Sequence, residues 1–271
     1  MTTLQEGIAQ IPRRNVGPIN FSVMPLVDAV NLVTNLGSQS LDKGVAVHFC
    51  NAYNVALADD DSAYAEIINS GDLVFTDGTP VVWAGQRLHK ELAPSWTRVY
   101  GHDMLTGVLA QANASTEPAP RHYFLGSTPE TIAALRNAIQ TNWPTATIAG
   151  MESPPFRPPT EAELAERDER IRESGATCIW VGLGTPKQDF EVHRVAEALP
   201  VVALAVGAAF DFIARTKRQA PEWMQDTGTE WCYRLATEPR RLGRRYFWGN
   251  PRFVAVVCRQ LLRRSGCSVR P

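Results

Sequence analysis

Apolar runs that end in polar turns recur along most of this chain of 271 residues. Each run has the length of a buried strand, and most are followed by a stretch whose apolar positions have helical spacing. We predict six strands in this way, at residues 45–50, 73–75, 122–125, 145–148, 178–181 and 201–206. Strands that alternate with helices favour a parallel sheet flanked by helices, so the pattern predicts a Rossmann-like α/β domain over residues 20–214.

Polar residues follow these strands directly. The carboxyl ends of parallel strands meet at one edge of a sheet, where open α/β sheets bind their ligands. Asp77 follows one strand and precedes a helix that begins at Thr79 and Pro80. Its carboxylate can accept a substrate proton or hold a ribose, although capping of the next helix explains this stretch equally well. Asn51 occupies the same kind of strand exit.

Two further segments contain residues that suit a phosphate. Arg98 lies in a loop before Gly101, where a guanidinium can bind a phosphate through two hydrogen bonds or form an ordinary surface ion pair. Gly126 permits a tight turn before a helix that begins at Pro129. A helix amino end of this kind suits either a phosphate or a simple reversal of the chain.

The clearest strand–turn–helix of the chain runs through residues 178–189. Gly182 and Gly184 permit close backbone approach at a helix start, and Lys187 and Gln188 project from the first turn of that helix. Lys187 stands where a dinucleotide fingerprint has its third glycine, so the signal for a nicotinamide site is weak.

The remaining features concern how well the N-terminal segment is ordered and in which cell compartment the protein works. Residues 1–19 are polar and contain Pro and Gly, and we expect them to form a loosely ordered lead. The apolar segments are too short for a signal peptide or a membrane span. The five cysteines lack metal-type spacing, which indicates reduced thiols in a cytoplasmic protein with no zinc site. We also expect no resident cofactor.

Charge separates the C-terminal segment from the rest. Residues 215–271 contain thirteen Arg and Lys but four Asp and Glu, a formal charge of +9, which leaves −10 on residues 1–214. Aromatic residues alternate with these arginines, so we predict a basic helical appendage that packs one face on the core and meets an anionic partner with the other. A lipid surface and single-stranded nucleic acid both fit that description.

Several motifs of the chain occur together, and in order, in one known family. From about residue 20 to residue 253 the chain resembles the WecG/TagA/CpsF glycosyltransferases. The matching segments are FTDG (75–78), RVYGHD (98–103), GLGTPKQ (182–188), GAAFD (207–211), QAPEW (219–223), GTEW (228–231), YRL (233–235) and EPRRL (238–242).

The resemblance implies a Rossmann-like fold and a metal-independent, inverting transfer of a sugar in cell-surface polysaccharide synthesis. The implied donor is a UDP-sugar such as UDP-N-acetylmannosamine, or a glucosyl or uronic-acid relative. The implied acceptor is a saccharide carried on polyprenyl diphosphate. The implied location is the cytoplasmic face of the cell membrane, to which the protein would bind peripherally.

The same resemblance assigns roles to residues of the core. It makes Asp77 the general base that deprotonates the acceptor hydroxyl, and it places Arg98 on a diphosphate. Gln188 would help to hold the donor or the acceptor, and Asp211 would lie near the nucleotide. The other candidate substrate contacts are Asn51, Gly126 and Gly184.

The tail of the family is thought to close over the active site and to touch the lipid diphosphate. Arg234, Arg241 and Arg244 are the candidates here, because they lie in or beside the matching motifs. One position departs from the family: a threonine commonly stands two residues before the asparagine that matches Asn51, and this chain has Phe49. Phe49 offers no hydroxyl to a substrate, which leaves the donor sugar open.

Two other classes of function share part of this pattern. A nicotinamide-dependent oxidoreductase would have the same fold, but the glycine fingerprint is incomplete. A nucleic-acid-binding protein would explain the basic aromatic tail, but it leaves the acidic core without a role. We therefore expect a UDP-sugar, a lipid-linked acceptor and an anionic membrane surface as partners, and no nucleic acid. Whether the chain forms a homo-oligomer stays open.

Overall fold

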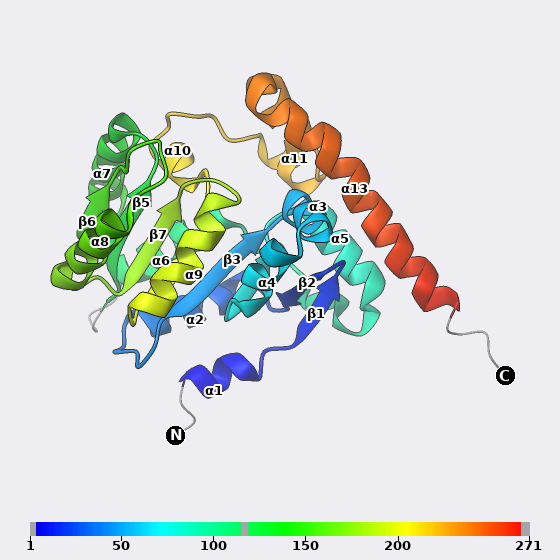
Figure 1. Ribbon diagram of the computed structural model, residues 1–271, viewed down its shortest axis with the longest axis horizontal. Helices are drawn as coiled ribbons and strands as arrows, with labels where there is room; N and C mark the ends of the chain where they lie inside the picture. The colour runs from blue at the N-terminus through cyan, green and yellow to red at the C-terminus, as the bar shows by residue number, and fades with distance from the viewer. Residues whose placement is uncertain (1–3, 115–118, 267–271) are drawn as a thin grey trace.

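A six-stranded parallel sheet forms the centre of the computed structural model, which describes residues 4–114 and 119–266 (Figure 1). The strand order is β4-β3-β8-β7-β5-β6. The strands are β3 (Val45–Cys50), β4 (Leu73–Thr76), β5 (Arg121–Gly126), β6 (Thr147–Glu152), β7 (Cys178–Gly182) and β8 (Val202–Leu204). All six predicted strands are present, which confirms the Rossmann-like α/β class.

Helices cover both faces of this sheet, and the apolar side chains of each face pack against them (Figure 1). Phe124 and Trp180 point to one face and Ile179 and Val181 to the other, and all four are fully buried. Burial on both faces explains why the strands are continuous apolar runs instead of alternating ones. One face is covered by α2 (Leu26–Gly37), α6 (Gly101–Ala114), α7 (Pro129–Asn142) and α10 (Ala209–Ile213), and the other by α8 (Glu161–Ser174) and α9 (Lys187–Ala198).

The N-terminal segment is more ordered than expected. After α1 (Leu4–Ala9), strands β1 (Arg13–Val16) and β2 (Ile19–Ser22) form an antiparallel hairpin. Val16 and Ile19 are fully buried in a cluster that also includes residues of the C-terminal helix. The prediction of a loose lead is therefore wrong for residues 13–19, because the apolar partners that order this hairpin come from distant parts of the chain.

The region after β3 contains two helices. These are α3 (Ala52–Asp60) and α4 (Ser62–Ser70). Asp61 ends the first and caps the second, since its side chain accepts hydrogen bonds from the backbone of Ala63 and Tyr64. Beyond β4 the chain forms α5 (Thr79–Leu88) and a 3₁₀ turn, η1 (Lys90–Ser95), before it enters α6.

The basic tail is helical, as expected, and its last helix runs along the side of the core (Figure 1). Its helices are α11 (Glu222–Asp226), α12 (Glu230–Thr237) and α13 (Pro239–Gly266). Arg252 and Arg259 of α13 both pair with Asp59 of α3, at 2.9 and 3.0 Å, while Phe253 is buried against the core. These contacts hold α13 against α3 and the core.

Two further expectations concern membrane-spanning helices and the cysteines. Within residues 4–114 and 119–266, no helix is long and apolar enough to cross a membrane. Cys50 and Cys178 are buried in strands as expected, whereas Cys232 and Cys258 are exposed on the tail. Cys267 lies outside the described residues.

Candidate active site

A pocket of about 90 Å³ lies at the carboxyl ends of β3 and β4, and the tail forms one of its walls. We call it the aspartate pocket. The core contributes Asn51, Asp77 and Tyr100, and the tail contributes Glu230, Arg234 and Arg245. Charged groups from segments more than a hundred residues apart in the chain therefore share one small space.

Asp77 occupies the floor of this pocket. Its backbone N–H donates to the carbonyl of Cys50 at 2.9 Å, which extends the β3–β4 ladder by one residue and holds the side chain at the sheet edge. Its Oδ1 accepts one hydrogen bond, from the Gly101 N–H at 3.4 Å. Among the described residues no Lys, Arg or His lies within 4 Å of its carboxylate, so Asp77 has no ion-pair partner.

The surroundings of Asp77 favour its protonated form. Burial, followed by the nearby carboxylate of Glu230, raises the pKa of Asp77 to about 8, against the opposing effects of the Gly101 N–H, Arg234 and Arg98. A general base works best when its pKa lies near the operating pH. The Asp77 side chain does not cap α5, the helix that follows it, but it accepts from the N–H of Gly101, the first residue of α6.

Asn51 and Arg245 face each other across the same pocket. Asn51 caps α3 through a hydrogen bond from the Tyr53 N–H at 3.0 Å, and its Oδ1 also accepts from Arg245 Nη2 at 3.3 Å. The Arg245 guanidinium lies 4.2 Å from the centre of the Tyr53 ring, and its Nε has no hydrogen-bond partner. No acidic side chain in the described parts of the chain lies within 4 Å of it.

An arginine in this position is electrostatically unsatisfied. Burial lowers the pKa of Arg245, and the neighbouring charges of Arg234 and Arg241 lower it further. Removal of a cation from water costs free energy unless an anion compensates it. Arg245 is therefore placed to bind an anionic ligand that enters the aspartate pocket.

Arg98 lies beside the pocket and is held by the tail. Its Nη2 donates to the side-chain oxygen of Gln225 at 3.1 Å, and its guanidinium lies 3.8 Å from Glu230 and 3.7 Å from Asp103. The guanidinium also lies 4.9 Å from the centre of the Tyr100 ring. Arg98 is thus close enough to Asp77 to lower its pKa, although it is not within ion-pair distance of the carboxylate.

The three arginines selected from the tail motifs differ in position. Arg234 lines the aspartate pocket beside Glu230. Arg241 is half-exposed and pairs with Glu238 at 2.6 Å, and Arg244 is exposed. Arg245, which the motif comparison missed, lies inside instead. Helical spacing marks it, since it falls on the same face of α13 as the buried Leu242 and Phe253.

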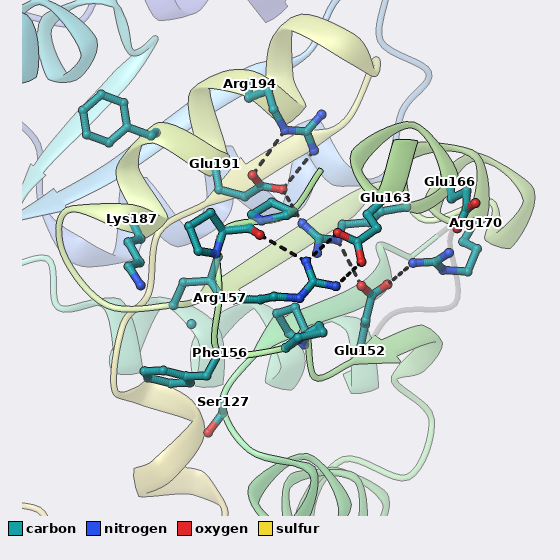
Figure 2. Close-up of a pocket in the computed structure, with 18 residues that line it drawn as sticks. Ser127, Glu152, Phe156, Arg157, Glu163, Glu166, Arg170, Lys187, Glu191 and Arg194 are labelled. Carbon is teal, nitrogen blue, oxygen red and sulfur yellow. Dashed lines mark hydrogen bonds and ion pairs between the residues drawn. The ribbon is translucent and has the colours of Figure 1, made fainter. Parts of the chain in front are cut away.

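A second and larger cavity, of about 720 Å³, opens at the carboxyl ends of β5, β6 and β7 (Figure 2). We call it the proline-loop cavity, because residues 154–159, which include four prolines, border it. Phe156 is 98% exposed, and Lys187 Nζ lies 5.5 Å from the centre of its ring. Figure 2 shows Ser127, Phe156 and Lys187 on one side of the cavity and a cluster of paired charges on the other.

The paired charges form a rigid wall. Arg167, only 4% exposed, contacts Glu152 at 3.0 Å and Glu191 at 3.1 Å, and Arg194 joins Glu191 to Asp168. Each carboxylate of this cluster already has a guanidinium partner. The wall therefore shapes the cavity, while Phe156 and Lys187 remain available to a ligand.

The other residues predicted to touch substrate lie at or just beyond the carboxyl ends of β5 and β7. Gly126 (φ 132°) packs against Gly182, where a Cβ atom would lie 2.6 Å from the Gly182 backbone. Gly184 (φ 78°) faces open space. Gln188 is buried and joins two loops, because it accepts from the Gly184 N–H and donates to the Ala205 carbonyl, both at 3.0 Å.

The last two sequence-level features lie apart from the pocket walls. Asp211, on α10, pairs with Lys217 at 3.0 Å at the start of the tail. Phe49 is 3% exposed and packs against Phe75 within the core, at a ring-centre distance of 5.8 Å. The side chain at position 49 therefore points into the sheet's apolar layer in this chain.

The sheet edge, the two cavities and the arginine-bearing tail fit the family expected from the motifs. The family model of the glycosyl transferase WecG/TagA/CpsF family matches residues 14–266. The chain belongs to this family. Membership implies glycosyl transfer with a nucleotide-sugar donor and a lipid-linked acceptor. It also makes glycosyl transfer, and neither nicotinamide chemistry nor nucleic-acid binding, the activity that the site has to explain.

Proposed function

We propose that this glycosyltransferase is an inverting enzyme that moves a sugar from a UDP-sugar to a saccharide on polyprenyl diphosphate. The observation that carries the proposal is the carboxylate of Asp77, unpaired and with a raised pKa, in a pocket whose other walls hold Asn51 and arginines. Inversion needs one base opposite the leaving group, and this arrangement supplies one.

The proposed reaction is a single displacement at the anomeric carbon. Asp77 takes the proton from an acceptor hydroxyl, the hydroxyl oxygen forms a bond to the anomeric carbon of the donor, and the bond from that carbon to the UDP oxygen breaks. UDP leaves with the electron pair, and the configuration at the anomeric carbon inverts. The proton returns from Asp77 to solvent before the next turnover.

The proline-loop cavity is our candidate binding site for the donor nucleotide. A volume of about 720 Å³ lies within the range typical of ligand pockets, whereas the aspartate pocket at about 90 Å³ is too small for a whole nucleotide sugar. Phe156 offers an exposed ring for stacking on a base, and Lys187 offers a cation for a phosphate. The glycine turns at Gly126 and Gly184 follow β5 and β7 at the edge of this cavity, where a diphosphate could approach the backbone.

Arginines take the role of charge stabilisation in this proposal, which is metal-independent. Arg98, Arg234 and Arg245 surround the carboxyl ends of β3 and β4, where the acceptor diphosphate and the departing UDP would both bring negative charge. Preorganised guanidinium groups stabilise such charge without reorganising during the reaction.

The outward face of α13 supports binding to an anionic membrane. Phe247, Val254 and Leu262 are 88, 57 and 72% exposed, and their spacing aligns them along one side of the helix. Arg240 and Arg244 continue that side at its N-terminal end, towards the aspartate pocket. An apolar stripe that ends in arginines suits a bilayer whose lipid-linked substrate presents its diphosphate at the surface.

Binding of the donor is the first test of this function. We would titrate UDP, UDP-sugars and NAD into the purified protein by calorimetry, in EDTA and again with Mg²⁺. The proposal predicts binding of UDP and of one UDP-sugar with equal affinity in both buffers, and no binding of NAD. Binding of NAD alone would overturn the proposal, and UDP binding only with Mg²⁺ would overturn its metal independence. Transfer to lipid-linked acceptors in vesicles would follow with the sugar that binds.

A further inference from the structure

Glu230, the first residue of α12, brings a second carboxylate to the pocket of the proposed base. It lines the aspartate pocket with Asp77, and its side chain is 19% exposed. Its carboxylate lies 3.8 Å from Arg98 Nη1 and 3.9 Å from Arg234 Nη1. Asp77, in the same pocket, has neither arginine within ion-pair distance.

The two carboxylates therefore compete for the same two cations. A guanidinium within about 4–6 Å of a carboxylate stabilises its charged form and lowers its pKa by about 1–3 units. A carboxylate stabilised in that way is a weaker base towards an acceptor hydroxyl. The position of the arginines thus decides how readily Asp77 takes up a proton.

We propose that Glu230 is a positioning residue of the transferase: it draws Arg98 and Arg234 to itself and leaves Asp77 unpaired and able to accept a proton. The inference rests on the proposed role of Asp77 as the base. Because Glu230 belongs to the tail and Asp77 to the core, the arrangement is complete only when α12 lies against the sheet edge. Docking of the tail would then complete the catalytic site as well as cover it.

Other groups around Asp77 do not replace this arrangement. Cys50 at the end of β3 and Tyr100 before α6 both have pKa values raised by burial, so they stay neutral near pH 8. Tyr246 and Arg245 of α13 line the same pocket. Burial likewise raises the pKa of Tyr246. Asp103 is the other acid on Arg98, at 3.7 Å, but it is not part of the pocket wall.

A purely structural role for Glu230 makes a different prediction. An acid at the first position of a helix stabilises the helix through its dipole, and its loss would lower stability alone. The direct test is the pKa of Asp77 itself, measured in the substrate-free protein by ¹³C-carboxyl NMR titration, with its signal assigned by comparison with Asp77→Asn. The variants are Glu230→Gln, Glu230→Asp and, as the matched control, Asp103→Asn.

The proposal predicts that Glu230→Gln lowers the pKa of Asp77 by at least about one unit, because the variant loses the repelling charge of Glu230 and releases the arginines towards Asp77. Glu230→Asp keeps the charge and should restore most of the shift, while Asp103→Asn should leave the pKa of Asp77 nearly unchanged. An unchanged pKa in Glu230→Gln, or an equal fall in Asp103→Asn, would overturn the proposal.

The pH dependence of transfer then separates this inference from the proposed function. In Glu230→Gln the acidic limb of the kcat/KM profile should move to lower pH with the pKa of Asp77, and its plateau should fall about tenfold or more. If the pKa of Asp77 measured by NMR falls but the acidic limb of the kcat/KM profile does not move, Asp77 is not the base. The proposed role of Glu230 in transfer is then also wrong. A limb that moves without any change in the NMR pKa would also contradict the proposal.

Discussion

The two cavities at the sheet edge differ in size, in charge and in the segments that form them. The proline-loop cavity measures about 720 Å³, is formed by the core alone, and has a wall in which Glu152, Glu163 and Glu191 pair with arginines. The aspartate pocket measures about 90 Å³ and needs residues from both the core and the tail. Among residues 4–114 and 119–266, its Asp77 carboxylate has no ion-pair partner and its Arg245 has no acidic partner.

This difference indicates that the two cavities have different functions. Paired charges stabilise a shape, and a preformed shape with an exposed aromatic ring suits binding. Unpaired charges in a small pocket cost stability, and their retention is typical of sites where charge develops during a reaction. We therefore expect changes in the proline-loop cavity to affect donor binding, and changes in the aspartate pocket to affect transfer.

The largest effect is expected for Asp77→Asn. The substitution keeps the shape of the side chain but removes most of its basicity, so transfer should fall by about a hundredfold or more while the Kd for UDP stays within about twofold. Initial rates with a lipid-linked acceptor and calorimetry with UDP measure the two effects. Asp61→Asn is the matched control, because asparagine can still cap α4, and it should leave both quantities unchanged. Full transfer by Asp77→Asn would remove Asp77 from the mechanism.

Arg245→Met should have the next largest effect. Loss of a charged hydrogen-bond donor to the substrate is expected to raise the KM for the acceptor about tenfold to a hundredfold. Thermal stability should stay equal or rise, because the variant no longer encloses an uncompensated cation. The control is Arg252→Met on the same helix, which breaks ion pairs to Asp59 and Asp60 and should lower stability without raising KM. The reverse pattern would show that Arg245 is merely structural.

Phe156→Ala tests the donor side of the comparison. Loss of a stacking ring should weaken UDP binding about tenfold, since stacking of one base contributes about 1–3 kcal/mol. Phe247→Ala is the control, because it removes another exposed phenylalanine from α13. It should leave UDP binding intact and weaken binding to anionic vesicles. Equal UDP affinity in wild type and Phe156→Ala would place the nucleotide elsewhere.

The smallest effect concerns stability as a function of pH. The folded-state pKa of Asp77, about 8, lies above its ordinary value of 3.8. Between these values the folded protein holds a proton that the unfolded chain has released, so this group lowers stability as pH rises through that window. Asp77→Asn removes the penalty and should stabilise the protein by at least about 1 kcal/mol at pH 9, and by little near pH 4. Denaturant unfolding at the two pH values measures the difference, and an equal difference at both would refute the raised pKa.

Local patterns were sufficient for much of the fold and for part of the site. The strands predicted at 45–50 and 73–75 are β3 and β4, and they place Asn51 and Asp77 at one sheet edge because parallel strands align their carboxyl ends. The capping box of Thr160 and Glu163 at the start of α8 is a similarly local feature. Such features involve residues a few positions apart, or strands that are apolar throughout because both faces of the sheet are buried.

The features that local patterns missed involve partners far apart in the chain. The β1–β2 hairpin is ordered by burial against α13. The family motifs indicated Arg244 as a ligand contact, but α13 directs the neighbouring Arg245 towards the pocket. Asp61 ends α3 because its side chain caps the next helix, a competition that a periodic pattern over 53–69 does not reveal.

The sequence by itself determined the family, the parallel sheet, the position of Asp77 at a strand exit and the positive charge of the tail. These follow from residue type and spacing along the chain. Only the tertiary structure placed Glu230 between Arg98 and Arg234, left Asp77 without an ion pair, and separated a 720 Å³ cavity from a 90 Å³ pocket. The physical reason is that charge interactions depend on distances of a few ångströms, and here the packing of α12 and α13 on the core sets those distances.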